Sequence, residues 1–279
     1  MKFQLDFLFS AFILQKRKGI EPMKYFMMIA ALLALFLCGC NTWHEEPLET
    51  SMTFEELEKK MRIAADPQNR YSELKSYQQS QIVLTQQLLD EPDEKFVTVK
   101  YLKPGYFSMT TYDDGGVTAL PVSGWIVTPD GGWIIDYQKK KVEKLSDEKL
   151  QMMRRPTELD DFAGKIRQNS EKVEVSACRV NGDKEYYKLV CYPRKHREEP
   201  IIYYVDQKTF LIYRMVTSFK LNGVRVNYEI TILRYALKDG IRMPEKSESV
   251  LNGICSETRL IDYKLNPGFT AADFTPPVF

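Results

Sequence analysis

The stretch that decides the fold is residues 213–232, YRMVTSFKLNGVRVNYEITI, in which two alternating runs flank Asn222-Gly223. Asn-Gly between two alternating runs is a strong signal for a β-hairpin with a two-residue turn. Such a turn sets Met215 opposite Ile230. Because side chains alternate between the two faces of a strand, this hairpin has one apolar face and one mostly wet face.

The same period of two extends from residue 81 to the carboxyl end. Close turn signals favour antiparallel pairing over βαβ units. The hairpin predicted at Asn252-Gly253 would set Glu248 against Glu257, and like charges directly opposite are unfavourable. We therefore expect a bulge or a longer loop to shift that register. The turn signals are Glu91-Pro92-Asp93, Pro104-Gly105, residues 113–116, residues 129–132, Asn181-Gly182, Asn222-Gly223, Asp239-Gly240 and Asn252-Gly253.

Amphipathic helices interrupt these strands. Thr53 and Glu56 have the spacing of a capping box, and Met52 and Leu57 occupy the positions of a hydrophobic staple. Two further helical stripes, starting at Ser146 and at Thr157, lie between the strands. The sequence therefore predicts a mostly β fold with a few α-helices, in which a large antiparallel sheet carries helices on its concave apolar face.

The amino end has the pattern of a targeting segment. Residues 25–38 form an uncharged apolar run after Lys24, too short to span a bilayer but suited to a signal-peptide core. The run ends in Leu37-Cys38-Gly39-Cys40, which resembles the lipobox of bacterial lipoproteins. The resemblance implies a signal peptide over residues 1–39, cleavage between Gly39 and Cys40, and a lipid on Cys40.

Two alternatives stay open for this segment. Translation starts at Met23, or it starts at Met1 and the signal has a long amino-terminal region. An ordinary cleaved signal, or an uncleaved anchor in which Cys40 is incidental, is the other interpretation. Under the lipoprotein interpretation, residues 40–52 form a short polar tether and residues 53–279 form the binding domain.

The charge balance limits the partners. The chain has 39 Lys and Arg against 38 Asp and Glu, and residues 40–279 have 34 against 36. A body of net charge −2 has no field for nucleic-acid phosphates and no electrostatic attraction to anionic lipid. We therefore expect no nucleic-acid partner, and a membrane contact made through the lipid anchor.

Catalytic and metal signals are sparse. His44 and His196 are the two histidines, and neither has a nucleophile nearby in sequence. We expect no cofactor, no metal and no catalytic residue; a hydrolase built from carboxylates is the alternative. After Cys40, the cysteines are Cys178, Cys191 and Cys255, an odd number that gives no disulfide framework. The Asn181-Gly182 turn predicts that Cys178 lies opposite about Tyr187 rather than Cys191.

Several stretches in order resemble the LolA/LolB superfamily, which includes the outer-membrane lipoprotein-sorting proteins. They are Lys103-Pro104-Gly105-Tyr106-Phe107-Ser108-Met109, Gly132-Trp133-Ile134-Ile135-Asp136-Tyr137, Val205-Asp206 through Leu211, Gly240-Ile241-Arg242-Met243-Pro244 and Asp273-Phe274-Thr275-Pro276. The resemblance covers residues 53–279. It implies an unclosed half-barrel whose curved sheet, covered by short amphipathic helices, holds acyl chains in a hydrophobic cavity.

Within that fold we name candidate site residues. The candidates for the cavity lining are Phe107, Met109, Trp125, Trp133, Met215, Tyr228 and Ile230. The candidates for a helical lid are Leu150, Met153, Leu159 and Phe162.

The function implied is a lipid-anchored, periplasm-facing protein that binds acyl chains of lipoproteins or lipids, with a lipoprotein carrier as a possible partner. Asn41 follows the lipidated cysteine. In enteric bacteria, Asp at this position retains a lipoprotein in the inner membrane, so Asn41 favours the outer membrane. The alternative function is an envelope-stress sensor of the RseB type that binds a membrane regulator.

Overall fold

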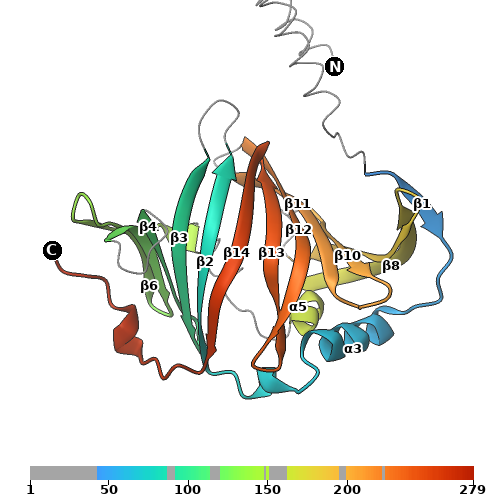
Figure 1. Ribbon diagram of the computed structural model, residues 1–279, viewed down its shortest axis with the longest axis horizontal. Coiled ribbons are helices and arrows are strands. Elements are labelled where there is room, and N and C mark those ends of the chain that lie inside the picture. Colours follow the sequence, from blue (N-terminus) through green and yellow to red (C-terminus); the bar gives the residue numbers. More distant parts are fainter. Residues whose placement is uncertain are drawn as a thin grey trace, which may run out of the picture. The chain divides into compact units, whose positions relative to one another are not determined.

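The structure is a computed structural model in which the chain falls into two compact units, residues 1–45 and residues 46–279. It describes residues 43–86, 92–113, 120–147, 149–150, 162–194, 199–221 and 224–279. Within this part of the chain, 14 strands form one sheet (Figure 1), in the order β1-β8-β9-β10-β11-β12-β13-β14-β2-β3-β4-β5-β6-β7. The edge strands β1 and β7 lie at opposite ends of this order, so the described sheet is an unclosed half-barrel, as predicted.

The strands are long and the helices short. The strands are β1 Glu45–Leu48, β2 Ser76–Gln86, β3 Asp93–Leu102, β4 Tyr106–Asp113, β5 Pro121–Thr128, β6 Gly131–Asp136, β7 Lys141–Lys144, β8 Ser170–Val180, β9 Lys184–Pro193, β10 Ile201–Asp206, β11 Ile212–Leu221, β12 Val224–Lys238, β13 Ile241–Leu251 and β14 Ile254–Leu265. The helices are α3 Phe54–Ala65 and α5 Phe162–Asn169, with 3₁₀ turns η1 Arg70–Ser72 and η2 Ala271–Phe274. None of the described helices is long and apolar enough to cross a membrane.

The hairpin register follows the sequence pattern. Met215 lies opposite Ile230 in the β11–β12 pair, which confirms the predicted register. The shift predicted for the β13–β14 hairpin is wrong, because Glu248 does lie opposite Glu257 without a bulge. Lys246 resolves the conflict: its Nζ lies 3.0 Å from Glu257 Oε2 on the next strand. A diagonal cation thus neutralises one of the two facing carboxylates.

One face of the sheet packs against α3 and α5, and we call it the inner face; Leu189, Tyr203 and Met215 lie on it. Helix α3 begins with the predicted capping box, in which Glu56 N–H donates to Thr53 Oγ1 at 3.3 Å and Thr53 N–H donates to Glu56 Oε2 at 3.0 Å. The cap fixes where the helix starts. Leu57 is therefore directed at the sheet and is 0% exposed.

The opposite face, which we call the outer face, is not polar throughout, because apolar side chains also lie on it at β3–β6. There the carboxyl-terminal segment folds back over the sheet, and Phe274 packs with Ile126 and Ile135. Phe274 is 1% exposed. The segment covers apolar side chains that a one-sided sheet would leave in water.

The predicted tether also contains ordered structure. Residues 45–48 form β1, which lies beside β8 at the edge of the sheet. The chain thus joins the sheet five residues after Cys40.

Removal of the α3 cap tests this account of the fold. We expect Thr53→Ala to lower the free energy of unfolding by about 1 kcal/mol, because an amide N–H of the first turn loses its acceptor. Urea unfolding followed by circular dichroism measures the change. The control is Thr50→Ala, whose hydroxyl accepts from Met52 N–H at 3.1 Å outside the helix. Equal losses in the two variants would contradict a specific role for the cap.

Candidate functional site

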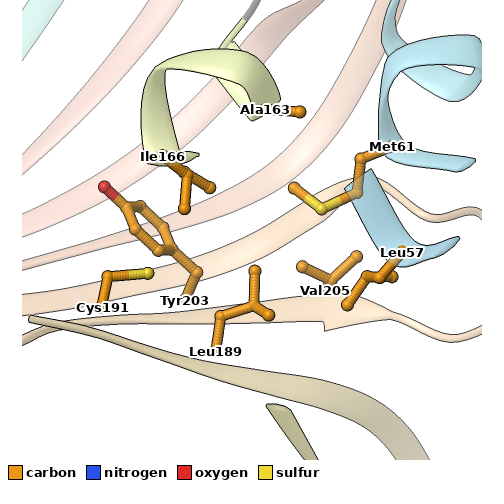
Figure 2. Close-up of a cluster of buried hydrophobic side chains, with 8 residues drawn as sticks. All are labelled: Leu57, Met61, Ala163, Ile166, Leu189, Cys191, Tyr203 and Val205. Atoms are coloured by element: carbon orange, nitrogen blue, oxygen red, sulfur yellow. The ribbon is translucent and has the colours of Figure 1, made fainter. Parts of the chain in front are cut away.

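The inner face is the candidate binding surface, and its most buried part lies beneath the two helices. Figure 2 shows this cluster, to which α3, α5 and strands β9 and β10 each contribute side chains. Its members are Leu57, Met61, Ala163, Ile166, Leu189, Cys191, Tyr203 and Val205. Burial raises the pKa of the Tyr203 hydroxyl well above its usual range. The cluster is therefore an uncharged apolar surface under a helical cover.

Three predicted lining residues extend this apolar surface across β11 and β12. Met215 packs against the helix-covered cluster and lies opposite Ile230. Tyr228 lies two residues before Ile230 on the same face, and burial raises the pKa of its hydroxyl. Tyr228 and Ile230 are partly exposed. The apolar surface thus continues beyond the helices to side chains that solvent or a ligand can reach.

Three more predicted residues form a second apolar region on the same face. Met109 on β4 lies opposite Trp125 on β5, and Phe107 lies opposite Val127. Met109 and Phe107 pack against a buried cluster of Leu74, Tyr77, Val97, Val99, Tyr101, Ile241, Met243 and Tyr263. Six of the seven predicted lining residues therefore share one face of the sheet, in two regions.

The remaining predicted residues are placed differently. Trp133 lies opposite Ile126 on the outer face, where it packs against the cluster around Phe274. Of the lid residues, Leu150 packs with Leu145 and Val127 on the inner face. Phe162 is the first residue of α5, and its side chain is not among those described. Met153, Leu159, Gly39 and Cys40 lie outside the described residues.

The inner face also carries a polar area that the sequence did not predict. Ser249 on β13 lies opposite Ile230 on one side and Ser256 on the other, and Ser256 lies opposite Thr85. Thr85 lies opposite Asp93 on β3. The inner face thus changes along a single cross-strand row from apolar to hydroxyl to carboxylate. The row is completed by the pairing of β14 with β2, which are not neighbours in sequence, so no local pattern predicts the whole row.

An ion triad ends the polar area. Lys95 Nζ lies 3.1 Å from Asp93 Oδ1 and 2.5 Å from Asp113 Oδ1. The hydrogen bonds to Asp113 and Asp93 raise the pKa of the Lys95 ammonium, so it is charged at neutral pH. All three side chains are between 33% and 55% exposed. The triad carries a net charge of −1 on the inner face.

A buried carboxylate ties the two covering helices together. Glu58 of α3 is 8% exposed, and its Oε2 accepts from Arg167 Nε of α5 at 2.7 Å. Its Oε1 accepts from Arg62 Nη2 at 2.9 Å. The hydrogen bond to Glu58 raises the pKa of the Arg167 guanidinium above its usual value. The helical cover is therefore one unit held by charge-assisted hydrogen bonds.

A cavity of about 200 Å³ also occurs, but mostly on the other side of the sheet. Lys100, Ser108 and Asp273 line it, which places it between the outer face of β3–β4 and the carboxyl-terminal segment. It is smaller than the ~300–1,000 Å³ pockets that hold drug-sized ligands. The open inner face remains the better candidate for an extended apolar ligand.

The described cysteines differ sharply in environment. Cys178, Cys191 and Cys255 form no disulfide, and Cys178 lies opposite Tyr186, one residue from the predicted partner. Cys178 and Cys191 are buried, whereas Cys255 is exposed. Burial raises the pKa of the Cys191 thiol to about 12. Cys191 is therefore a neutral side chain of the helix-covered cluster.

The fold, a large unclosed antiparallel sheet with helices on one face, also occurs in solved structures. No protein-family model matches the sequence, and no curated protein is a significant sequence match. Solved structures do match. The chain is similar to a DUF1329 family protein from Desulfovibrio piger, with a TM-score of 0.55 and 13% identity over 80% of this chain and 95% of that one.

Two further solved structures carry names from the predicted superfamily. A LolA superfamily protein from Nitrosomonas europaea matches with a TM-score of 0.53 and 14% identity, over 81% of this chain and 99% of that one. A structure described as an outer membrane lipoprotein-sorting protein domain, from Vibrio parahaemolyticus, matches with a TM-score of 0.52 and 13% identity, over 80% and 97%. The predicted resemblance is thus confirmed at the level of the fold.

The burial of the thiols yields a testable difference. At pH 8 we expect Cys255 to react with a thiol reagent at least ~100-fold faster than Cys178 and Cys191, because burial shields both thiols and raises the pKa of Cys191. Mass spectrometry of peptides after timed labelling measures each rate. Cys255→Ser should remove the fast reaction, and denaturation should make the remaining thiols equally reactive. Fast labelling of Cys191 in the folded protein would show that the helical cover is open.

Proposed function

We propose that this protein is a lipid-anchored, periplasm-facing binding protein that holds acyl chains of lipoproteins or lipids on its inner face. The observation that carries the proposal is the apolar inner face, partly covered by α3 and α5 and partly reachable at Met215, Tyr228 and Ile230. An acyl chain gains ~0.8 kcal/mol for each methylene that it buries. A long chain therefore binds such a surface without any specific polar contact.

The names of similar structures support this proposal. One is described as an outer membrane lipoprotein-sorting protein domain and another as a LolA superfamily protein. The binding is noncovalent and needs no catalytic group. We place the protein in the cell envelope, at the inner leaflet of the outer membrane of a Gram-negative-type bacterium, with a role in lipoprotein sorting.

The proposed anchor is the lipid on Cys40 at the end of a cleaved signal peptide. The chain enters β1 at Glu45, five residues after the proposed lipid attachment at Cys40. The body of residues 40–279 carries 36 acidic against 34 basic residues and gains no attraction to anionic lipid. The acyl groups on Cys40 therefore supply the membrane affinity.

Acyl binding on the inner face is tested with a matched pair of leucines. Leu251 is 43% exposed and Leu237 is 55% exposed, and Leu251 lies opposite Tyr228 on the inner face. Leu237 lies opposite Arg242, which alternates along β13 with the inner-face residues Ile241 and Met243, and Leu237 is therefore directed to the outer face. We expect Leu251→Glu to weaken binding of a fluorescent fatty-acyl probe about tenfold. The reason is that the methylenes of the probe would displace water from the new carboxylate, which is unfavourable.

Leu237→Glu is the control and should leave probe affinity unchanged. The measurement is a fluorescence titration of purified protein stripped of bound lipid, with circular dichroism to show that both variants fold. Competition by a lipoprotein should displace the probe. Equal effects of the two substitutions would argue against the inner face, and the absence of probe uptake by the unchanged protein would reject the function.

The anchor is tested with two neighbouring cysteines. We expect Cys40→Ser to abolish incorporation of radiolabelled palmitate in a bacterial host and to stop cleavage after Gly39. Cys38→Ser should leave both unchanged, because residue 38 lies within the signal peptide that is removed. Mass spectrometry of the mature amino terminus identifies the cleavage site. A free, unlipidated terminus at any other residue would contradict the proposal.

A further inference from the structure

The inner face is amphipathic, and its polar area has a definite place relative to the apolar regions. One cross-strand row runs through Met215, Ile230, Ser249, Ser256, Thr85 and Asp93. Directly opposed residues in adjacent strands share a face, so this row is continuous on the inner face. A ligand lying along the row meets an apolar surface at one end and charged side chains at the other.

The dimensions of the row suit one lipid molecule. From Thr85 on β2 to Met215 on β11 the row crosses four strand spacings, about 19 Å at ~4.8 Å each. One leaflet of a bilayer hydrocarbon core is about 15 Å thick, which is the depth that one acyl chain spans. An acyl chain lying on Ile230 and Met215 therefore leaves its polar end near Thr85 and the ion triad.

The polar end of the row offers both charges. Asp93 and Asp113 flank Lys95 with carboxylates, and the three side chains are partly exposed. Thr85 Oγ1 and Ser256 Oγ lie 3.1 Å apart, and these hydroxyls both donate and accept hydrogen bonds. A headgroup that carries only negative charge would face two carboxylates and one ammonium, so repulsion would outweigh attraction. A headgroup that carries a phosphate and an ammonium can pair with both signs.

We propose that the ligand held on the inner face is a zwitterionic phospholipid with a primary ammonium, whose headgroup lies on Asp93, Lys95 and Asp113 beside the hydroxyls of Thr85 and Ser256. This inference rests on the proposed acyl-binding function and names its substrate class. The ammonium pairs with the two carboxylates, and the phosphate pairs with Lys95 and the hydroxyls. A quaternary ammonium cannot donate hydrogen bonds to the carboxylates and fits less well.

The experiment is a competition among headgroups. Purified protein is incubated with an equimolar mixture of phospholipids that have identical acyl chains and ethanolamine, choline or glycerol headgroups. The bound lipids are then extracted and quantified by mass spectrometry. We expect the ethanolamine lipid to be enriched ~5-fold over each of the others, the ratio that one net charge-assisted hydrogen bond provides.

Substitution of the triad supplies the second arm. The double variant Asp93→Asn with Asp113→Asn should lose the preference for ethanolamine over glycerol, because the ammonium loses its carboxylates and Lys95 remains for phosphate. The control is Glu174→Gln, which removes the carboxylate of an exposed pair with Lys172 on β8, away from the row. It should retain the preference. Circular dichroism shows that each variant is folded.

The outcomes separate the two levels of the hypothesis. Lipid bound without headgroup preference, or a preference that survives in the double variant, would overturn the headgroup assignment while leaving acyl binding intact. No bound lipid of any kind would reject the proposed function itself. Loss of the preference in the Glu174→Gln control would also overturn the assignment, because the effect would not be specific to the triad.

Discussion

The structure depends on the burial of one apolar face of a sheet that does not close. Strand alternation directs Leu189, Tyr203 and Val205 to the same side, and an apolar sheet face left in water is unstable. Helices α3 and α5 cover that side, with Leu57 and Ile166 packed onto the strands. Because the Glu58 carboxylate links the two helices through Arg167, the cover is a single unit placed over one part of a larger surface.

This partial cover gives the inner face its functional character. Where the helices end, Tyr228 and Ile230 continue the apolar surface with partial exposure. Beyond them the hydroxyls of Ser249 and Ser256 and the triad around Lys95 make the same face polar. The outer face, by contrast, is covered on β3–β6 by the chain's own carboxyl-terminal segment. A ligand-binding role therefore fits the inner face better than the outer one.

Local sequence patterns predicted the parts that depend on near neighbours. The Asn222-Gly223 turn set Met215 opposite Ile230, and the Thr53 capping box started α3 where expected. The resemblance motifs predicted the fold that the solved structures share. The Asn252-Gly253 hairpin kept its simple register despite facing glutamates, because Lys246 compensates diagonally. Pairwise rules miss such diagonal contacts since each considers one opposed pair at a time.

The sequence by itself determined the mostly β class, the register of the Asn222-Gly223 hairpin and a lining set of which six residues share one face. Only the tertiary structure decided that Trp133 packs on the other face and that a polar row continues the inner face from Ile230 to Asp93. The reason is the range of the interactions. Alternation and turn geometry act within a few residues, whereas the row joins Thr85 to Ser256, which are far apart in the chain and meet only when β2 pairs with β14.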